Sequence, residues 1–142
     1  MALLPQAWRD TARAMSQENV EIVRRTYETD DPDPDLYDAE AVFDNSNAIF
    51  ADPGVYRGLD QIREYYDAQG EMWESQRYEP QEFIPIGVDQ VVVSDEIVSV
   101  GRDGVEVVAR VATLYTLRAG KITHLKTFQT KAEALEAAGL SE

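Results

Sequence analysis

Residues 90–117 read QVVVSDEIVSV-GRDG-VEVVARVATLYTL, two long runs rich in β-branched side chains on either side of four polar or glycine residues. β-branched residues are enriched in strands because their side chains pack well on a pleated surface. Asp103-Gly104 is a hairpin signal, since tight two-residue turns need positive φ angles. The stretch therefore predicts an antiparallel hairpin with strands at 90–100 and 105–117.

The second of these strands, 105–117, is apolar on both faces. Side chains alternate between the two faces of a strand, and here both sets contain several apolar members. We expect helices to cover one face and a second subunit to cover the other, so we infer a homodimer. The two sets are Val105, Val107, Ala109, Val111, Thr113, Tyr115 and Leu117 on one face, and Glu106, Val108, Arg110, Ala112, Leu114 and Thr116 on the other.

Helical spacing appears before this hairpin. SQENVEIVRRTYE begins with the helix-entry residue Ser16 and has Val20, Val23 and Tyr27 at helical spacing. The run LDQIREYYDAQGEMWESQ, residues 59–76, carries an apolar stripe and is expected to be the main helix. The residues of that stripe are Ile62, Tyr65, Tyr66, Met72 and Trp73.

From Tyr78 onward the chain shows a period of two residues. YEPQEFIPIG contains two prolines, so this segment belongs at a sheet edge or at bulges. KITHLKTFQ, residues 121–129, is the last strand expected, and Thr130 with Glu133 forms a capping box that opens a final helix. Helices that precede a long antiparallel meander predict an α+β fold in which the helices cover one face of a curved sheet.

A chain of 142 residues suits one domain. Residues 1–14 look like an N-terminal extension, and residues 15–142 are expected to form the single domain, because the helical pattern begins directly after Met15. The alternative is that the extension adds an amphipathic turn to the domain. The apolar residues of such a turn are Leu3, Leu4 and Trp8.

Composition excludes several classes of function. Asp and Glu outnumber Lys and Arg by 27 to 13, and a chain with a net charge of −14 repels nucleic acids and anionic lipid heads. No cysteine is present, which excludes disulfides, thiolate metal sites and a cysteine nucleophile. No apolar run reaches the roughly 18 residues that span a bilayer. We expect a cytoplasmic protein with neither nucleic-acid nor membrane partners.

No metal and no cofactor are expected. The segment TDDPDPDLYDAE imitates the opening of a calcium-binding loop, but Leu36 replaces the required glycine and Val42 stands where the closing glutamate belongs. A solvated, proline-punctuated linker is the better interpretation. His124 is the only histidine, and beside Lys126 a partly exposed surface position is the favoured interpretation over a general base.

The order of elements and several motifs resemble the SnoaL-like branch of the nuclear transport factor 2-like superfamily. The matching stretches are SQENVEIVRRTYE, VYRGLDQIREYY, LYTLRAGKI and KAEALEAAGL, which together cover most of residues 16–140. The resemblance implies a curved antiparallel sheet wrapped round helices into a cone, with a pocket at its open end and usually a dimer. This scaffold carries isomerases, cyclases, epoxide hydrolases, dehydratases and non-catalytic binders, so the fold alone does not name an activity.

The catalytic residues of two such enzymes do not carry over to this chain. Where ketosteroid isomerases have a base, a second aspartate and a tyrosine, the resemblance places Asn45, Ala112 and Thr26. Limonene-type epoxide hydrolases hold a water with a tyrosine and an asparagine on the first strand, and FDN supplies Phe43 and Asn45 there. Their Arg-x-Asp pair falls near Ser94–Glu96, where only carboxylates are present, and the last acid of their triad falls on Thr127.

FDNSN, residues 43–47, places four polar side chains at the end of the first strand. A buried Asn45 offers two donors and two acceptor lone pairs without a charge, which suits the holding of a carbonyl, hydroxyl or water. The alternative is an Asx-type turn whose side chains bond to nearby backbone. Arg110 raises a similar question, because a mid-sheet arginine pairs either with Glu96 or Glu106 or with an anionic group of a ligand.

The expected function is the binding of a small, mostly apolar molecule in the pocket of the cone. In one hypothesis the protein is a cofactor-independent enzyme of the isomerase, cyclase or epoxide-hydrolase type, with Asn45 positioning the substrate and Asp95 or Glu96 as the base. In the other it is a non-catalytic binding or assembly module. A carboxylate that faces the pocket near Asn45 would distinguish them. The expected walls are Tyr27, Phe43, Tyr56, Tyr66 and Trp73, with Asn45 and Arg110 as polar anchors.

Overall fold

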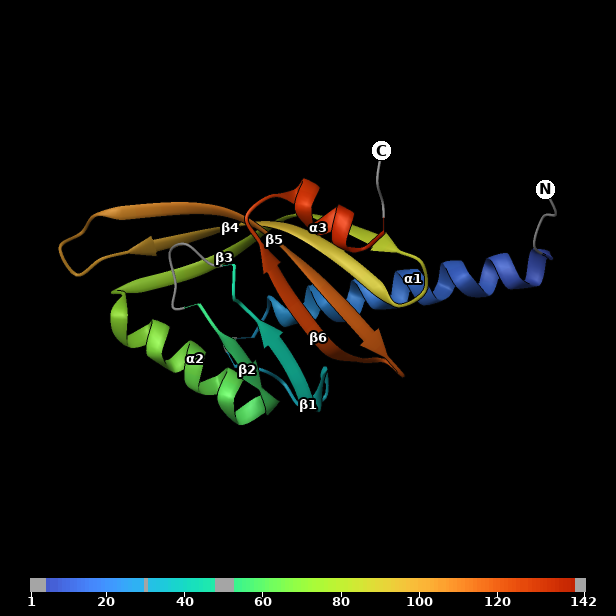
Figure 1. The fold of residues 1–142 in the computed structure, drawn as a ribbon, viewed down its shortest axis with the longest axis horizontal. Coiled ribbons are helices and arrows are strands. Elements are labelled where there is room, and N and C mark those ends of the chain that lie inside the picture. The colour runs from blue at the N-terminus through green and yellow to red at the C-terminus, as the bar shows by residue number, and fades with distance from the viewer. Residues whose placement is uncertain (1–4, 30, 48–52, 140–142) are drawn as a thin grey trace.

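The computed structural model describes residues 5–29, 31–47 and 53–139. Three helices and six strands follow one another along these residues (Figure 1). Their bounds are α1 (Gln6–Thr26), β1 (Tyr37–Asp44), β2 (Val55–Arg57), α2 (Gly58–Met72), β3 (Ser75–Ile86), β4 (Gln90–Val100), β5 (Glu106–Arg118), β6 (Lys121–Phe128) and α3 (Lys131–Ala137).

All six strands form one curved sheet in the order β2-β1-β6-β5-β4-β3. Every neighbouring pair is antiparallel except β1 and β6, which run parallel. Helices α1 and α2 pack on one side of this sheet, and α3 lies on the other side (Figure 1). The predicted α+β fold, a curved sheet wrapped round N-terminal helices, is confirmed.

The β4–β5 hairpin forms where its sequence predicts it. Its strands pair in continuous register from Gln90↔Thr116 to Val100↔Glu106, and Gly104 in the turn has a φ of +86°. Gly101 N donates to Val105 O at 2.9 Å and closes the turn. A side chain at Gly104 would be strained in this conformation, which is why a glycine stands here.

Strand β3 is an edge strand, as the prolines Pro80 and Pro85 predict. Its pairing with β4 shifts register between Pro80 and Glu82. A proline has no N–H to donate, so it is tolerated at such an edge or irregularity. The main helix, by contrast, ends four residues earlier than predicted, at Met72, because Trp73 already has extended backbone angles and β3 begins at Ser75.

Two clusters of buried side chains lie on the two sides of the sheet. The cluster on the α1 and α2 side includes Val23 and Ile62, both almost completely buried. On the other side, Ala112 and Leu114 of β5 pack with Ala134 of α3. The expectation that a second subunit covers this whole face is therefore wrong in part, because α3 of the same chain already covers these β5 residues.

Helix α1 runs without interruption through Met15, so the predicted helix start at Ser16 is wrong. Instead of capping a helix, the Ser16 hydroxyl donates to Gly87 O at 2.6 Å. The first half of α1 extends beyond the sheet (Figure 1), and Trp8 is 63% exposed. The apolar turn considered for this region includes Leu3 and Leu4, which lie outside the described residues.

Helix α3 begins as its sequence predicts. Thr130 accepts a hydrogen bond at its hydroxyl from Glu133 N at 3.1 Å, which confirms the N-terminal cap. Gly139 follows the helix with a φ of +89°, the left-handed conformation that ends helices. Among the helices of the described residues, none is long and apolar enough to cross a membrane.

Candidate functional site

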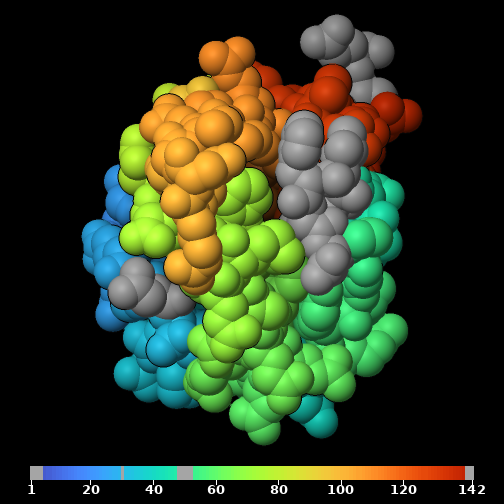
Figure 2. Space-filling view, turned by 90° about the vertical axis from the view of Figure 1, so that its left-hand side faces the viewer, coloured from blue at the N-terminus to red at the C-terminus, as the bar shows by residue number. Residues whose placement is uncertain are grey.

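A cavity of about 480 Å³ opens between the end of α1, the helix α2 and the concave side of the sheet. The β4–β5 hairpin (orange) and the region of α2 and β3 (green) form the end of the molecule shown in Figure 2. The lining is dominated by aromatic rings. Its aromatic residues are Tyr27, Tyr37, Phe43, Tyr65, Tyr66, Trp73, Tyr78, Tyr115 and Phe128.

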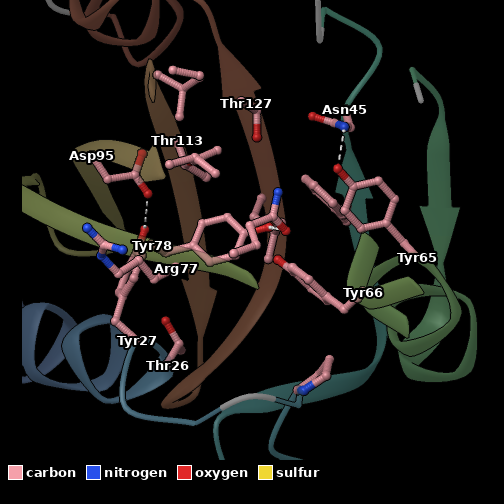
Figure 3. Close-up of a pocket in the computed structure, with 18 of the residues that line it drawn as sticks. Thr26, Tyr27, Asn45, Tyr65, Tyr66, Arg77, Tyr78, Asp95, Thr113 and Thr127 are labelled. Carbon is pink, nitrogen blue, oxygen red and sulfur yellow. Dashed lines mark hydrogen bonds between the residues drawn. The ribbon is translucent and has the colours of Figure 1, made fainter. Parts of the chain in front are cut away.

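Asp95 of β4 is a buried carboxyl in the wall of this cavity, with 4% of its surface exposed. The Tyr27 hydroxyl donates to Asp95 Oδ2 at 3.3 Å (Figure 3), and Asp95 Oδ1 has no hydrogen-bond partner among the described residues. Burial raises the pKa of Asp95 to about 7, and the hydrogen bond from Tyr27 opposes this rise. The cavity therefore holds a carboxyl that changes charge near neutral pH.

A second hydroxyl extends this polar group. The hydroxyl oxygens of Tyr27 and Tyr115 lie 2.8 Å apart, within hydrogen-bond distance. Burial raises the pKa of Tyr27 and of Tyr115 well above the ordinary tyrosine value. Both hydroxyls keep their protons at neutral pH. While the single O–H of Tyr27 donates to Asp95, the Tyr115 O–H donates to the Tyr27 oxygen.

In the FDNSN stretch, Asp44 forms the Asx-type turn and its neighbour Asn45 lines the cavity. Asp44 forms the turn, because its Oδ1 accepts hydrogen bonds from Ser46 N at 3.0 Å and from Ser46 Oγ at 2.6 Å. Asn45 is 3% exposed, lies in the lining of the cavity, and donates through Nδ2 to Tyr65 Oη at 3.1 Å. Its backbone N–H donates to Gly54 O at 2.7 Å, which holds Asn45 against the start of β2.

Four of the five aromatic residues that were predicted as walls line the cavity, and the fifth, Tyr56, does not. Phe43 packs edge-on against Tyr65 with ring centroids 5.1 Å apart and parallel to Tyr66 at 6.1 Å. Tyr27, Phe43, Tyr66 and Trp73 line the cavity. Tyr56 lies behind that wall, because it packs against Phe43 and Tyr65 and is not among the residues that line the cavity.

Arg110 and Glu96 lie on the opposite face of the sheet from the cavity. Arg110 Nε and Glu96 Oε2 form an ion pair of 3.1 Å, and 85% of the Arg110 side chain is exposed. The reason is strand alternation: Asp95 on β4 and Val111 on β5 face the cavity, so the residues next to them face away. The predictions that Arg110 anchors a ligand and that Glu96 is a base in this cavity are therefore corrected.

Five of the aromatic lining residues were absent from the predicted site: Tyr37, Tyr65, Tyr78, Tyr115 and Phe128. Tyr115 shares the alternation of Thr113 and Val111 along β5, a signal that was present in the sequence. Tyr78 comes from the edge strand β3, and its hydroxyl donates to Gln76 Oε1 at 3.2 Å. No local pattern in β3 predicts that this strand curls over the cavity.

The lining offers no metal site within the described part of the chain. No group of three or more His, Cys, Asp or Glu side chains there is arranged to hold a metal ion. The two polar groups of the cavity lie on opposite sides of it: Asp95 with Tyr27 on one side, and Asn45 with Tyr65 on the other (Figure 3). The rings of Tyr66 and Tyr78 lie between them.

Solved structures with the same fold include proteins that hold small molecules. TerC, co-crystallised with polyporic acid, matches with a TM-score of 0.70 and 18% identity over 87% of this chain and 99% of that chain. A protein of ketosteroid isomerase-like fold from Catenulispora acidiphila, in complex with trimethylamine, matches with a TM-score of 0.65 and 17% identity. The match covers 85% of this chain and 94% of that chain. A phenazine biosynthesis-related protein from Pseudomonas aeruginosa matches with a TM-score of 0.65 and 16% identity. The match covers 94% of this chain and 92% of that chain.

The sequence itself identifies the family. Curated proteins yield no significant sequence match to this chain. Residues 13–125, by contrast, match the family described as SnoaL-like domain. This range contains most of α1, all of α2 and β1–β5, and β6 as far as Leu125. The structural matches agree with that assignment in fold. The chain therefore belongs to the SnoaL-like domain family.

Proposed function

We propose that this protein binds a small, mostly apolar molecule in the cavity and catalyses proton transfer on it, with Asp95 as the general acid–base. The observation that carries the proposal is the buried carboxyl of Asp95 in the cavity wall, with a pKa of about 7. A group that titrates near the working pH can both accept and return a proton. Two proteins of the same fold were crystallised with small organic molecules, which supports a ligand in this cavity.

The chemistry is that of a cofactor-independent isomerase or cyclase. With an enolisable ketone in the cavity, ionised Asp95 takes a proton from the carbon next to the carbonyl, and the carbonyl oxygen becomes an enolate oxygen. The Tyr27 O–H donates to the Asp95 carboxyl and holds it in place, and Tyr115 lies within hydrogen-bond distance of Tyr27. In a β,γ-unsaturated ketone the enolate extends over the neighbouring C=C bond, so return of the proton from Asp95 to the γ-carbon gives the conjugated isomer. Attack of the enolate carbon on a second carbonyl of the same molecule gives a ring, and Asp95 returns its proton to the new alkoxide.

Asn45 serves the other end of the ligand in this proposal. It lies across the cavity from Asp95, and its amide carries no charge to desolvate (Figure 3). Such a group holds a carbonyl or hydroxyl without competing for the proton. The enzyme hypothesis asked for a carboxylate that faces the pocket near Asn45. Asp95 lines the cavity on the side opposite Asn45 (Figure 3), and Glu96 faces away from it.

The exchange of the acidic C–H protons of 2-tetralone with D2O, followed by NMR, tests the proposal. We expect the protein to accelerate exchange, with a rate that rises with pH through about 7 because only ionised Asp95 is a base. Asp95→Asn should lower the protein-catalysed rate by about 10²- to 10⁴-fold, the usual contribution of general acid–base catalysis. Glu96→Gln is the matched control, since Glu96 is the next residue on the same strand and faces away.

The same measurement separates an enzyme from a non-catalytic binding module. If 2-tetralone binds but exchange is no faster than in buffer from about pH 5 to about pH 9, on both sides of the Asp95 pKa, the catalytic role is refuted. If Asp95→Asn and wild type accelerate exchange equally, the base is another group.

A further inference from the structure

Two buried polar side-chain atoms in the described residues have no hydrogen-bond partner: Trp73 Nε1 and Asp95 Oδ1. Buried polar groups are nearly always paired, so each exception asks for an explanation. Both residues line the same cavity. A ligand in the cavity that pairs with both atoms explains the two exceptions together.

The two atoms make opposite demands. The indole N–H of Trp73 can only donate a hydrogen bond, so it requires an acceptor on the ligand. Ionised Asp95 can only accept, so its Oδ1 requires a donor. Trp73 comes directly after α2 and Asp95 lies within β4, so the two atoms contact the ligand from different elements.

The charges around the cavity disfavour an anionic ligand. Among the described lining residues Arg77 is the only basic one, and its Nε pairs with Glu79 Oε2 at 3.3 Å. Asp31, Glu74 and Asp95 belong to the same lining, so acidic groups outnumber the one cation around the cavity. The chain as a whole has a net charge of −14, which opposes an anionic ligand further.

We propose that the ligand is an uncharged hydroxy-carbonyl compound, whose hydroxyl donates to Asp95 Oδ1 and whose carbonyl oxygen accepts from Trp73 Nε1. This rests on the proposed function in using the same cavity and carboxyl, and it adds Trp73 as the residue that selects the ligand. The aromatic walls bind the body of the ligand between these two polar contacts.

Four probes of one shape test this assignment: 6-acetyl-2-naphthol, 2-naphthol, 2-acetylnaphthalene and naphthalene. Their dissociation constants are measured by calorimetry on the whole protein. We expect the acetyl group and the hydroxyl group each to strengthen binding by about 5- to 150-fold, the effect of one buried hydrogen bond. The four wild-type measurements need no variant, so a folding defect cannot obscure them.

Two variants then assign each polar group to a residue. Trp73→Phe keeps an aromatic ring but removes the N–H, so the gain from the acetyl group should fall to about 1-fold while the gain from the hydroxyl stays. Asp95→Leu should remove the gain from the hydroxyl and keep that from the acetyl group. Trp8→Phe is the matched control, because Trp8 is exposed on α1 far along the chain from the lining residues.

The outcomes separate this inference from the proposed function. Equal gains from the acetyl group in wild type and Trp73→Phe overturn the inference, as does tighter binding when a carboxylate or a trimethylammonium group replaces the acetyl. If the hydroxyl contributes through Asp95 and the acetyl contributes nothing, the inference fails and the proposed function stands. If none of the four probes binds while 2-tetralone exchange is accelerated, the inference fails and the proposed function stands.

Discussion

Asp95 couples the stability of the fold to pH. Its pKa is raised from 3.8 to about 7 by burial, so the folded protein binds a proton more tightly than the unfolded chain does. The free energy of unfolding therefore decreases as pH rises from about 4 to about 7. In this range the unfolded chain has already released the proton, whereas the folded protein must either hold it or bury a charged carboxylate. Asp95→Asn removes this loss.

We accordingly expect Asp95→Asn to become more stable relative to wild type as pH rises across that window. The gain is up to about 4 kcal/mol, since one pKa unit corresponds to about 1.4 kcal/mol. Urea unfolding of both proteins at about pH 4 and about pH 8 measures it, and all other titrations cancel in the difference. A stability difference that is the same at both pH values contradicts the raised pKa.

Asn45 is expected to contribute to both stability and binding. Asn45→Ala removes the hydrogen bond to Tyr65 Oη from a buried position and should lower the free energy of unfolding by about 1–3 kcal/mol. It should also weaken the binding of 2-tetralone by about 5-fold or more. Asp44→Ala is the control, because it removes the turn at Ser46 and the ion pair with Lys126 at 3.5 Å but no side chain of the cavity lining. If Asn45→Ala lowers stability and leaves probe binding unchanged, Asn45 belongs to the scaffold and not to the site.

At the scale of elements, helix α1 has two halves with different roles. Its buried residues, Asn19, Ile22 and Val23, all follow Met15. The Asn19 side chain donates to Val88 O at 2.7 Å and joins the second half of α1 to the β3–β4 turn. The first half lies beyond the sheet with Trp8 and Met15 exposed.

Removal of residues 1–14 should therefore leave the domain folded, as the predicted boundary at Met15 requires. We expect a small change in Tm and no change in 2-tetralone binding, since the truncation removes no residue of the cavity lining. Asn19→Ala is the comparison, because it breaks a buried contact of the second half and should cost about 1–3 kcal/mol. A truncated chain that fails to fold would place residues 1–14 within the domain.

At the scale of the whole molecule, we propose a homodimer through the face of the sheet that α3 leaves uncovered. Val108 lies on this face, on the same side of β5 as Arg110, and is 50% exposed. An exposed apolar side chain on a sheet face is buried when a second subunit covers that face. A second copy of the same face is the occupant proposed here, because isologous pairing is the commonest way to bury it.

Light scattering should give a mass of about twice the 16.0 kDa of one chain. Val108→Asp should reduce it to that of one chain without unfolding the protein, because the substitution adds a charge only to the exposed face. Added salt should strengthen the dimer, since it screens the repulsion between two chains of net charge −14. A mass near that of one chain in dilute wild-type protein contradicts the proposal.

Local patterns in the sequence determined the elements of this fold. The two-residue period and Asp103-Gly104 define the β4–β5 hairpin, the prolines place β3 at an edge, and Thr130 caps α3. Each depends on residues close together in the chain, so the sequence alone is sufficient. The end of α2 was predicted less well, because Trp73 fits the helical stripe and only its contacts with the sheet and cavity make it leave the helix.

Tertiary structure alone decided which carboxylate lines the cavity. Asp95 and Glu96 are adjacent on a strand with apolar residues on both faces, so alternation separates them but does not say which one faces inward. The packing of α1 and α2 on one face and α3 on the other makes that choice, and it pairs Arg110 with Glu96 outside. The raised pKa of Asp95 follows from the same packing, since desolvation depends on what surrounds the carboxyl in space and not on its neighbours in the sequence.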